Sequence, residues 1–287
     1  MILLFLRKIK NMQITLGYST CPNDTFIFDA MVHHKVDTEG LKFNVVLSDV
    51  EELNKNAFNG TIDVTKLSYH AFAYIADNYK LLNSGSALGY KNGPLLISKH
   101  KIFPDEVSVL KVAIPGKFTT ANLLFSIFYP AAKEKIEYLF SDIEEAVLSG
   151  EADAGLIIHE NRFTYEKKGL KKIIDLGEEW EKKTKSPIPL GGIVIHRKFD
   201  PETQMKVSRV LKRSIEYAFE NPASSYNYVK SYAQELNDDV IKKHINLYVN
   251  NFTVDLGETG KRAINTLFVK AEKEKIISTI PEDIFVI

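Results

Sequence analysis

Two stretches of the chain repeat one order of apolar and polar positions. In residues 13–69 and again in residues 111–160, a short apolar run ends at a turn, an apolar helical run follows, and acidic residues then open a second helical run. That second run ends at Gly60 or Gly150, and a buried-type strand comes next. Alternating strands and helices are typical of parallel sheets, so each stretch predicts one α/β unit. Any βαβ protein shows the same order, so a true repeat remains one of two interpretations.

Polar residues precede the helical runs at corresponding positions of the two units. The first helices follow Asn23-Asp24-Thr25 and Thr119-Thr120, and the second helices open at Asp49 and Asp142 with glutamates in the next positions. Ser, Thr, Asn and Asp satisfy free backbone N–H groups at a helix start, and acidic groups suit the positive end of the helix dipole. The predicted helix starts therefore correspond.

Two further apolar runs are entered through glycine, at Gly93-Pro94 and at Gly191-Gly192. They predict a pair of strands that cross between two lobes. The remaining sequence predicts helices over 201–219, over 222–236, after a cap at Asp238-Asp239, and over 257–275. We expect this helical tail to pack on the first lobe.

The whole pattern predicts an α/β fold with two lobes and a ligand cleft between them, of the type II periplasmic-binding-protein kind. We expect lobe 1 to comprise 12–96 and 195–287, including the C-terminal helices, and lobe 2 to comprise 97–194. The length of 287 residues, 45% of them hydrophobic, is sufficient for two such lobes.

Charge and composition narrow the classes of partner. The 37 Lys and Arg balance the 37 Asp and Glu, and no basic block stands out, so a nucleic-acid partner is not expected. No stretch is long and apolar enough to span a bilayer, and Met1–Lys10 does not resemble a secretory signal. The regular pattern begins at Gln13, so Met12 is a candidate for the true start. We expect a cytoplasmic protein with a small-molecule substrate, and the oligomeric state stays open.

The predicted strand ends select a set of cleft residues. Ligands bind outside the carboxyl ends of strands in open α/β sheets. This rule selects Cys21 to Thr25, Ser68-Tyr69-His70, Thr119-Thr120-Ala121, and His159 with Arg162. Hydroxyls and free N–H groups at Thr119-Thr120-Ala121 suit a carboxylate or phosphate, although the threonines could also serve only as helix caps.

His159 follows the apolar strand 155–158 at the edge of a sheet, and an imidazole there could act as a base near neutral pH. A lone histidine in such a position is more often structural. The other six histidines show no metal-ligand spacing, so no metal is expected.

The single cysteine, Cys21, lies beside a helix start and could be nucleophilic, but Pro22-Asn23-Asp24 is better interpreted as the start of the helix. Phe163, Tyr165 and Trp180 could form a wall for a ring-shaped ligand, or belong to the core.

Several strings together resemble the 1,4-dihydroxy-6-naphthoate synthases, a late enzyme family of the futalosine route to menaquinone. The matching strings are Gly17-Tyr-Ser-Thr-Cys-Pro-Asn-Asp-Thr-Phe-Ile-Phe28, Asp63-Val-Thr-Lys-Leu-Ser68, Gly93-Pro-Leu-Leu96, Ala113-Ile-Pro-Gly116, Thr119-Thr-Ala121, Ala154-Gly-Leu-Ile-Ile-His-Glu-Asn-Arg-Phe-Thr-Tyr165, Asp175-Leu-Gly177, Trp180-Glu181 and Pro187-Ile-Pro-Leu-Gly191. The resemblance is close over 13–197 and weak in the helical tail. Thr20 and Glu179 depart from the family pattern, where proline and a second tryptophan are common.

The resemblance implies a carbon–carbon lyase without metal or cofactor. Such an enzyme converts cyclic dehypoxanthine futalosine into 1,4-dihydroxy-6-naphthoate and releases dihydroxyacetone. The family's proton acceptor corresponds to His159, and its substrate contacts correspond to Lys66, Leu67, Ser68, Thr120 and Ala121.

Two alternatives remain at this point. A non-catalytic solute-binding protein would share the fold, but it would normally need an export signal or a lipid anchor. A chorismate dehydratase of the same pathway resembles the chain less well, because its Tyr-Leu-Asn string is replaced here by Cys21-Pro-Asn-Asp24.

Overall fold

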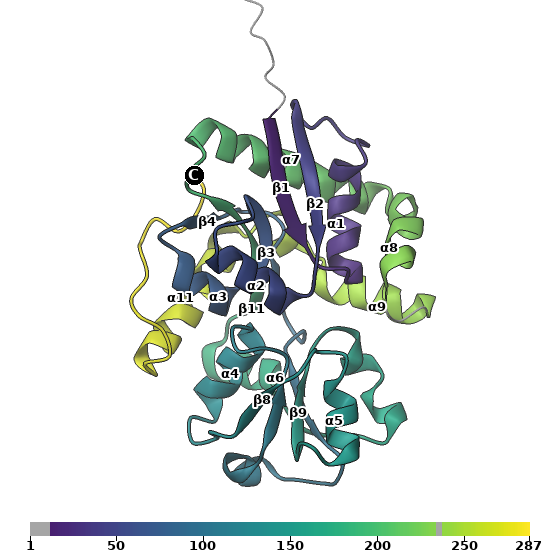
Figure 1. Cartoon of the computed structure of the whole chain (residues 1–287), viewed down its shortest axis with the longest axis vertical. Helices are drawn as coiled ribbons and strands as arrows, with labels where there is room; N and C mark the ends of the chain where they lie inside the picture. Colours follow the sequence, from purple (N-terminus) through teal and green to yellow (C-terminus); the bar gives the residue numbers. More distant parts are fainter. Residues whose placement is uncertain (1–11, 234–236) are drawn as a thin grey trace, which may run out of the picture.

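The computed structural model describes residues 12–233 and 237–287 and contains two β-sheets, one above the other in Figure 1. The first sheet has the order β2-β1-β3-β11-β4, with β5 also pairing with β11, and the second has the order β8-β7-β9-β6-β10. The strands of the first sheet are β1 (Met12–Tyr18), β2 (Leu41–Leu47), β3 (Val64–Ser68), β4 (Tyr79–Leu81), β5 (Ala87–Gly89) and β11 (Ile188–His196). Those of the second are β6 (Leu95–Ser98), β7 (Val112–Ile114), β8 (Lys135–Glu137), β9 (Ala154–Ile157) and β10 (Lys171–Asp175). The predicted α/β class is confirmed.

The two sheets have equivalent halves. The parallel order β2-β1-β3 in the first matches β8-β7-β9 in the second. Beyond this half, β11 pairs antiparallel with β3, and β6 pairs antiparallel with β9. The repeated sequence pattern therefore does reflect two units of the same topology, and the carboxyl ends of β3 and β9 lie at corresponding positions.

The helices begin close to where the polar residues predict. Asp49 caps α2 by accepting from two backbone N–H groups, and Thr119 caps α4 in the same way through Asn122. The α-helices are α1 (Pro22–Val32), α2 (Val50–Phe58), α3 (Tyr69–Ile75), α4 (Thr120–Phe128), α5 (Ile143–Ser149), α6 (Leu176–Thr184), α7 (Pro201–Glu220), α8 (Tyr226–Tyr232), α9 (Asp238–Tyr248), α10 (Asn251–Val254) and α11 (Gly257–Lys273). The 3-10 segments are η1 (Pro104–Val109), η2 (His159–Phe163), η3 (Tyr165–Lys168) and η4 (Pro222–Ser225).

Three predicted helix boundaries need correction. The cap of α1 is Cys21, because the helix already includes Asn23-Asp24-Thr25, and the cap of α9 is Asn237 rather than Asp238-Asp239. The helix expected over 222–236 begins as η4, and α8 ends at Tyr232. The predicted end at Leu236 lies outside the described residues, whereas the candidate start, Met12, is the first residue of β1. Over the two described ranges, no helix combines the length and apolarity needed to cross a membrane.

The C-terminal helices divide between the two sheets. Helices α7, α8 and α9 pack around α1, as Figure 1 shows, whereas α11 contacts both β11 and α4. One continuous apolar cluster contains Phe72 of α3, Phe125 of α4, Trp180 of α6 and Phe268 of α11. The tail therefore packs on the first sheet and its helix α1, and α11 also contacts α4 beside the second sheet. Burial of each such side chain contributes about 1.5–3 kcal/mol, so this cluster joins the two sheets more firmly than the crossover strands alone.

Strand pairing bears on where the two lobes meet. Leu95 and Leu96 of β6 pair with β9 in the second sheet, and Ile188 to Val194 of β11 already belong to the first sheet. If the lobes are defined by the sheet to which each strand belongs, both crossovers lie a few residues earlier than the predicted lobe limits at 96/97 and 194/195. The lobe limits stay a prediction.

Candidate active site

A cleft of about 660 Å³, part of it open to solvent, lies where both sheets present the carboxyl ends of parallel strands. The residues from β3, α4 and the end of β9 that the sequence selected as site residues all line it: Lys66, Leu67, Ser68, Thr120, Ala121 and His159. They meet because the equivalent topology of the two units directs both strand ends to one cleft.

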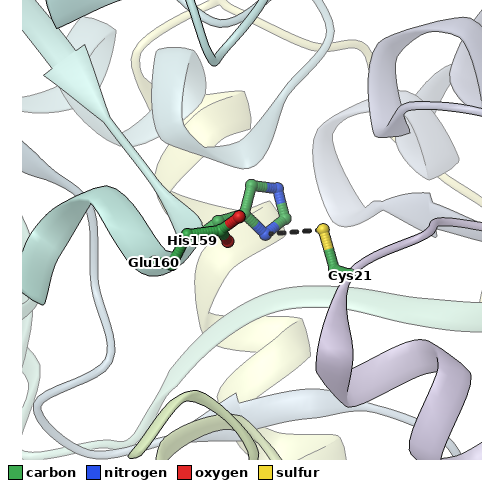
Figure 2. Close-up of side chains that lie close together, drawn as sticks. All are labelled: Cys21, His159 and Glu160. Carbon is green, nitrogen blue, oxygen red and sulfur yellow. Dashed lines mark hydrogen bonds between the residues drawn. The ribbon is translucent and has the colours of Figure 1, made fainter. Parts of the chain in front are cut away.

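His159 occupies an unusual backbone conformation at the start of η2. Its φ of +58° lies in the left-handed region, which costs a residue with a Cβ of the order of 1 kcal/mol and occurs often at functional sites. The imidazole is partly exposed to the cleft, and its Nδ1 lies 3.3 Å from the sulfur of Cys21, as Figure 2 shows. Burial lowers the pKa of His159 below its ordinary value, although the carboxylates of Glu160 and Asp24 act in the opposite direction. The imidazole is therefore neutral near pH 7.

Cys21 caps α1 beside His159 and is only 6% exposed. Burial raises the pKa of its thiol well above the usual range, and the negative charge of Glu160 adds to this effect. A thiol that stays protonated at neutral pH is a poor nucleophile. The structure thus brings Cys21 into contact with His159, which the sequence could not show, but as a hydrogen-bond partner of the imidazole.

A buried ion pair forms one wall of the cleft. Nζ of Lys66 donates to Oδ1 of Asp24 at 3.1 Å, and Oδ2 of Asp24 accepts from the Ser19 hydroxyl at 2.7 Å. Nδ2 of Asn23 donates to the same Oδ1 at 2.7 Å. Buried charges require such compensation, and here every bond to Asp24 is a donation, so its carboxylate is an acceptor throughout.

The polar groups of Ser68 and Thr120 differ in their availability to a ligand. The Ser68 hydroxyl accepts from Nδ2 of Asn54 at 3.3 Å, which leaves its own proton for a ligand. By contrast, Oγ1 of Thr120 donates to the carbonyl oxygen of Leu190 at 2.5 Å. What α4 offers at its first turn is therefore the backbone N–H groups of Thr120 and Ala121, at the positive end of the helix dipole.

Six residues that the strand-end rule selected do not line the cleft: Cys21, Pro22 and Thr25 at the start of α1, and three others, Tyr69, His70 and Arg162. The Tyr69 hydroxyl hydrogen-bonds to Ser86 at 2.7 Å, and Nδ1 of His70 lies 3.2 Å from the carbonyl oxygen of Thr119. Burial lowers the pKa of His70 to about 4, although its bond to Thr119 acts in the opposite direction. The third, Arg162, donates to the carboxylate of Asp175 at 3.2 Å. All three are committed to structural contacts.

Phe163, Tyr165 and Trp180, which could have formed a wall for a ring-shaped ligand, do not line the cleft. Trp180 is fully buried and donates from Nε1 to the carbonyl oxygen of Pro187 at 3.1 Å. Tyr165 belongs to the apolar cluster of the second sheet, and neither it nor Phe163 lines the cleft. The aromatic side chain in the cleft wall is instead Tyr248 of α9.

Sequence reasoning missed three polar contributors to the cleft: Ser19 after β1, Asn92 and Tyr248. Asn92 lines it just before Gly93-Pro94, and both polar atoms of its buried side chain have no hydrogen-bond partner among the described residues. The one sequence feature that could have indicated Asn92 is its position directly before the predicted crossover strand that begins at Gly93-Pro94. Tyr248 comes from the helical tail, where the sequence gives no indication of proximity to the sheets.

One group of side chains has the composition of a transition-metal site. The ligating atoms of Cys21, His159 and Glu160 lie within 4.8 Å of one another, and sulfur, imidazole and carboxylate suit zinc. Cys21 lies 138 positions from His159 in the sequence, so a search for local metal-ligand spacing could not detect the group. Sγ of Cys21 and Nδ1 of His159 already satisfy each other as hydrogen-bond partners, so neither requires an ion, and we assign none.

Comparison with known proteins identifies close relatives over nearly the whole chain. A family model described as menaquinone biosynthesis matches residues 14–273. The chain is 42% identical to a 1,4-dihydroxy-6-naphthoate synthase of Thermus thermophilus over 95% of its length and 99% of that protein. It is 38% identical to the synthase of Streptomyces coelicolor, over 94% of the chain and 96% of the relative.

Solved structures agree on the fold. A protein from Archaeoglobus fulgidus superposes with a TM-score of 0.88 at 37% identity, covering 92% of this chain and 98% of that one. The alkanesulfonate-binding protein of Xanthomonas axonopodis superposes with a TM-score of 0.70 at 12% identity, covering 96% of both chains. The second likeness shows the fold alone, and it confirms the predicted periplasmic-binding-protein-like architecture.

Proposed function

The chain belongs to the menaquinone biosynthesis family, and from that membership we propose that it is an enzyme with the lyase activity of its 1,4-dihydroxy-6-naphthoate synthase relatives. In this reaction cyclic dehypoxanthine futalosine is cleaved to 1,4-dihydroxy-6-naphthoate and dihydroxyacetone. The forming aromatic ring makes the carbon–carbon cleavage favourable once a proton has been removed. The protein then has to bind, orient and deprotonate its substrate.

His159 is the proposed proton acceptor, and its geometry is the observation that carries the proposal. A neutral imidazole with a lowered pKa stands in the wall of the cleft, held in a left-handed backbone conformation that its surroundings must maintain. A general base must be unprotonated at working pH and within reach of the substrate. The imidazole of His159 meets the first condition and is accessible for the second.

The contact with Cys21 decides which nitrogen can serve as the base. Nδ1 of His159 is occupied by the sulfur, so Nε2 has to accept the proton from the substrate. In a neutral imidazole only one nitrogen carries hydrogen, so Nδ1 must be the protonated one and must donate to Sγ. In this proposal Cys21 orients the ring and selects its tautomer, and it is not a nucleophile.

Substrate binding in this proposal uses both walls of the cleft. The naphthoate carries a carboxylate, which suits the N–H groups of Thr120 and Ala121 at the start of α4. The free Ser68 proton and the Asn92 amide suit hydroxyl and carbonyl groups, and Lys66 supplies positive charge. Leu67 contributes an apolar surface at the end of β3. No metal or electron-sink cofactor is needed for deprotonation and cleavage.

We also propose that the enzyme acts in the cytoplasm on its small-molecule substrate, without a nucleic-acid or membrane partner. The balanced charge of the sequence and its lack of a basic block support this.

The direct experiment incubates the purified protein with cyclic dehypoxanthine futalosine and follows 1,4-dihydroxy-6-naphthoate by chromatography. Appearance of the naphthoate together with dihydroxyacetone would support the lyase. Binding of the substrate without any product would favour the solute-binding alternative, and turnover of chorismate instead would favour the dehydratase.

A further inference from the structure

The loop between β7 and α4 is bound to a helix that belongs to the other sheet. Phe118 in this loop donates its backbone N–H to Oε1 of Glu51, 3.0 Å away. Glu51 lies in α2, which packs against β3 of the first sheet, whereas β7 is a strand of the second sheet. Glu51 is only 5% exposed. The bond is therefore a buried connection between elements of the two sheets, placed directly before the first turn of α4.

The second oxygen of Glu51 continues this connection to Ser68. Oε2 accepts from Nδ2 of Asn54 at 2.9 Å, and the same nitrogen donates to the Ser68 hydroxyl at 3.3 Å. Oδ1 of Asn54 accepts from the backbone N–H of Ser68 at 2.9 Å, and because a backbone nitrogen can only donate, this bond fixes the orientation of the amide. A chain of hydrogen bonds thus runs from Phe118 through Glu51 and Asn54 to Ser68.

The conformation of the loop leaves room for the side chain of Glu51. Gly116 has a φ of +139°, which side chains with a Cβ rarely adopt, and a Cβ at this position would lie 2.5 Å from Cδ of Glu51. The ring of Phe118 also packs edge-on against Phe58 of α2, with centroids 4.6 Å apart. Helix α2 therefore holds both the backbone and a side chain of the loop.

The glutamate at the corresponding position of the second unit makes different contacts. Glu144 stands two positions after Asp142, as Glu51 stands two positions after Asp49. Its carboxylate accepts from Asn161 at 3.0 Å and from Lys168 at 2.6 Å, which belong to η2 and η3 on the same side of the molecule as the second sheet. The contact of Glu51 with the other sheet is therefore specific to the first unit and does not follow from the topology that the two units share.

We propose that Glu51 is a positioning residue, which aligns the two walls of the cleft with each other. Ser68 lines the cleft from the first sheet, and Thr120 and Ala121 line it from the start of α4. Glu51 itself is not part of the lining, but its hydrogen bonds connect Ser68 to the loop directly before Thr120. A ligand that uses both walls needs this alignment, because small displacements of binding groups weaken a contact. The use of the alignment for a carboxylate ligand rests on the proposed function.

Hydrogen–deuterium exchange of single backbone amides, followed by NMR of the full-length protein, tests the alignment without a ligand. E51M keeps a side chain of similar length and removes both acceptors, so the Phe118 amide should exchange roughly 2–10-fold faster, as the loss of one hydrogen bond requires. D63A is the matched control, because Asp63 accepts from the backbone N–H of Thr15 at 2.8 Å within the first sheet. This variant should speed exchange at Thr15 and leave Phe118 unchanged. An E51M protein with wild-type exchange at Phe118 overturns the proposal.

Affinity for two probes separates positioning from simple stabilisation. The probes are 1,4-dihydroxy-6-naphthoate and 1,4-dihydroxynaphthalene, which lacks the carboxylate. E51M should raise the Kd of the naphthoate by roughly 2–10-fold and that of the naphthalene by less, since the N–H groups of α4 would bind the carboxylate. In turnover, KM should change more than kcat, because His159 follows β9 and not this loop. D63A should lower Tm and leave both Kd values unchanged. Equal losses of affinity for the two probes in E51M contradict the positioning role.

A conservative variant tests whether hydrogen bonding is the cause. E51Q keeps the length of the side chain and one acceptor oxygen, so it should recover part of the protection of the Phe118 amide and part of the affinity for the naphthoate. If E51Q is no better than E51M, an acceptor at this place makes no difference and the proposal is wrong. Failure of the proposed function gives a different result: a wild type that binds neither probe removes that function, and the exchange of Phe118 in E51M still decides whether Glu51 holds the loop.

Discussion

Nδ1 of His159 and Sγ of Cys21 lie 3.3 Å apart, although 138 positions separate the two residues in sequence. The contact joins the end of β9, in the second sheet, to the start of α1, which follows β1 of the first sheet. A cysteine beside a histidine is the arrangement of many nucleophilic enzymes. Here burial and the charge of Glu160 keep the thiol protonated, so the same geometry supports a base and its orienting partner.

Replacement of Cys21 by alanine should therefore leave most of the activity. The variant loses one hydrogen bond to Nδ1, which contributes about 0.5–1.5 kcal/mol, so kcat/KM should fall by roughly 2–10-fold. Cys21→Ser, which keeps an acceptor for the Nδ1 proton, should lose less than Cys21→Ala. A loss of several orders of magnitude in both variants, or a substrate adduct on Cys21 detected by mass spectrometry, would show a nucleophile instead.

Replacement of His159 by asparagine should separate binding from chemistry. The side chains are similar in size and both are polar, so substrate affinity should remain while kcat falls by roughly 10²–10⁴-fold, the usual contribution of a positioned base. Equilibrium binding and single-turnover measurements would report the two quantities separately. Near-normal turnover would remove His159 from the mechanism.

The pH dependence of the wild type should carry the signature of the same residue. Burial lowers the pKa of His159, so the protonated form appears only below the ordinary histidine value of about 6.5. The ratio kcat/KM should be maintained above that pKa and lost as pH falls through it, because imidazolium cannot accept a proton. H159N should lack this acid limb. His70→Asn is the control, since His70 lies outside the cleft lining, and its variant should retain the limb.

Local signals predicted the strand ends well, and the site residues that depend on those ends were found. Ser68 is the last residue of β3, His159 comes shortly after the end of β9, and Thr120 follows β7 after the turn at 117–118. The same rule failed for Tyr69 and His70, because α3 begins at once and directs both side chains into packing contacts. Helix start positions and strand ends are local properties, whereas side-chain direction after them depends on packing.

Contacts between distant segments could not be predicted in this way. Tyr248 reaches the site because α9 packs against α1 and η2, and amphipathic periodicity says which face of α9 is buried but not against what. The tail also bridges the two sheets through α11, which a count of crossover strands could not reveal. The pattern of apolar and polar positions was sufficient to predict the sheet topology, whereas the arrangement of the C-terminal helices around the sheets depends on tertiary packing.

Ser68→Ala and Thr120→Val should differ in their effects, because only the serine has a proton free for the substrate. Ser68→Ala should raise KM by the equivalent of about 1–3 kcal/mol with little change in Tm, if a buried polar group of the substrate loses its partner. Thr120→Val removes the bond to the carbonyl oxygen of Leu190 but keeps the backbone N–H, so it should lower Tm more than it raises KM. Equal changes in KM would indicate that the Thr120 hydroxyl also contacts the substrate.

Asn92 offers the sharpest test of the cleft, because its amide is buried without a partner in the described structure. Asn92→Leu keeps the branched shape and removes the unpaired groups, so Tm should stay constant or rise. If the amide binds the substrate, KM should increase by roughly 5–150-fold in the same variant, as the loss of about 1–3 kcal/mol requires. Stability and affinity should therefore move in opposite directions.

Asn83→Leu is the matched control for this variant. Asn83 is a second asparagine with an unpartnered buried oxygen, but it lies outside the cleft lining and donates to the carbonyl oxygen of Val286 at 3.2 Å. Its replacement should lower Tm through the lost bond and leave KM unchanged. Thermal unfolding and initial-rate kinetics on both variants give the comparison. If Asn92→Leu instead lowers Tm and leaves KM unchanged, the amide is a structural element of the crossover, and the substrate contacts lie on the other residues of the cleft.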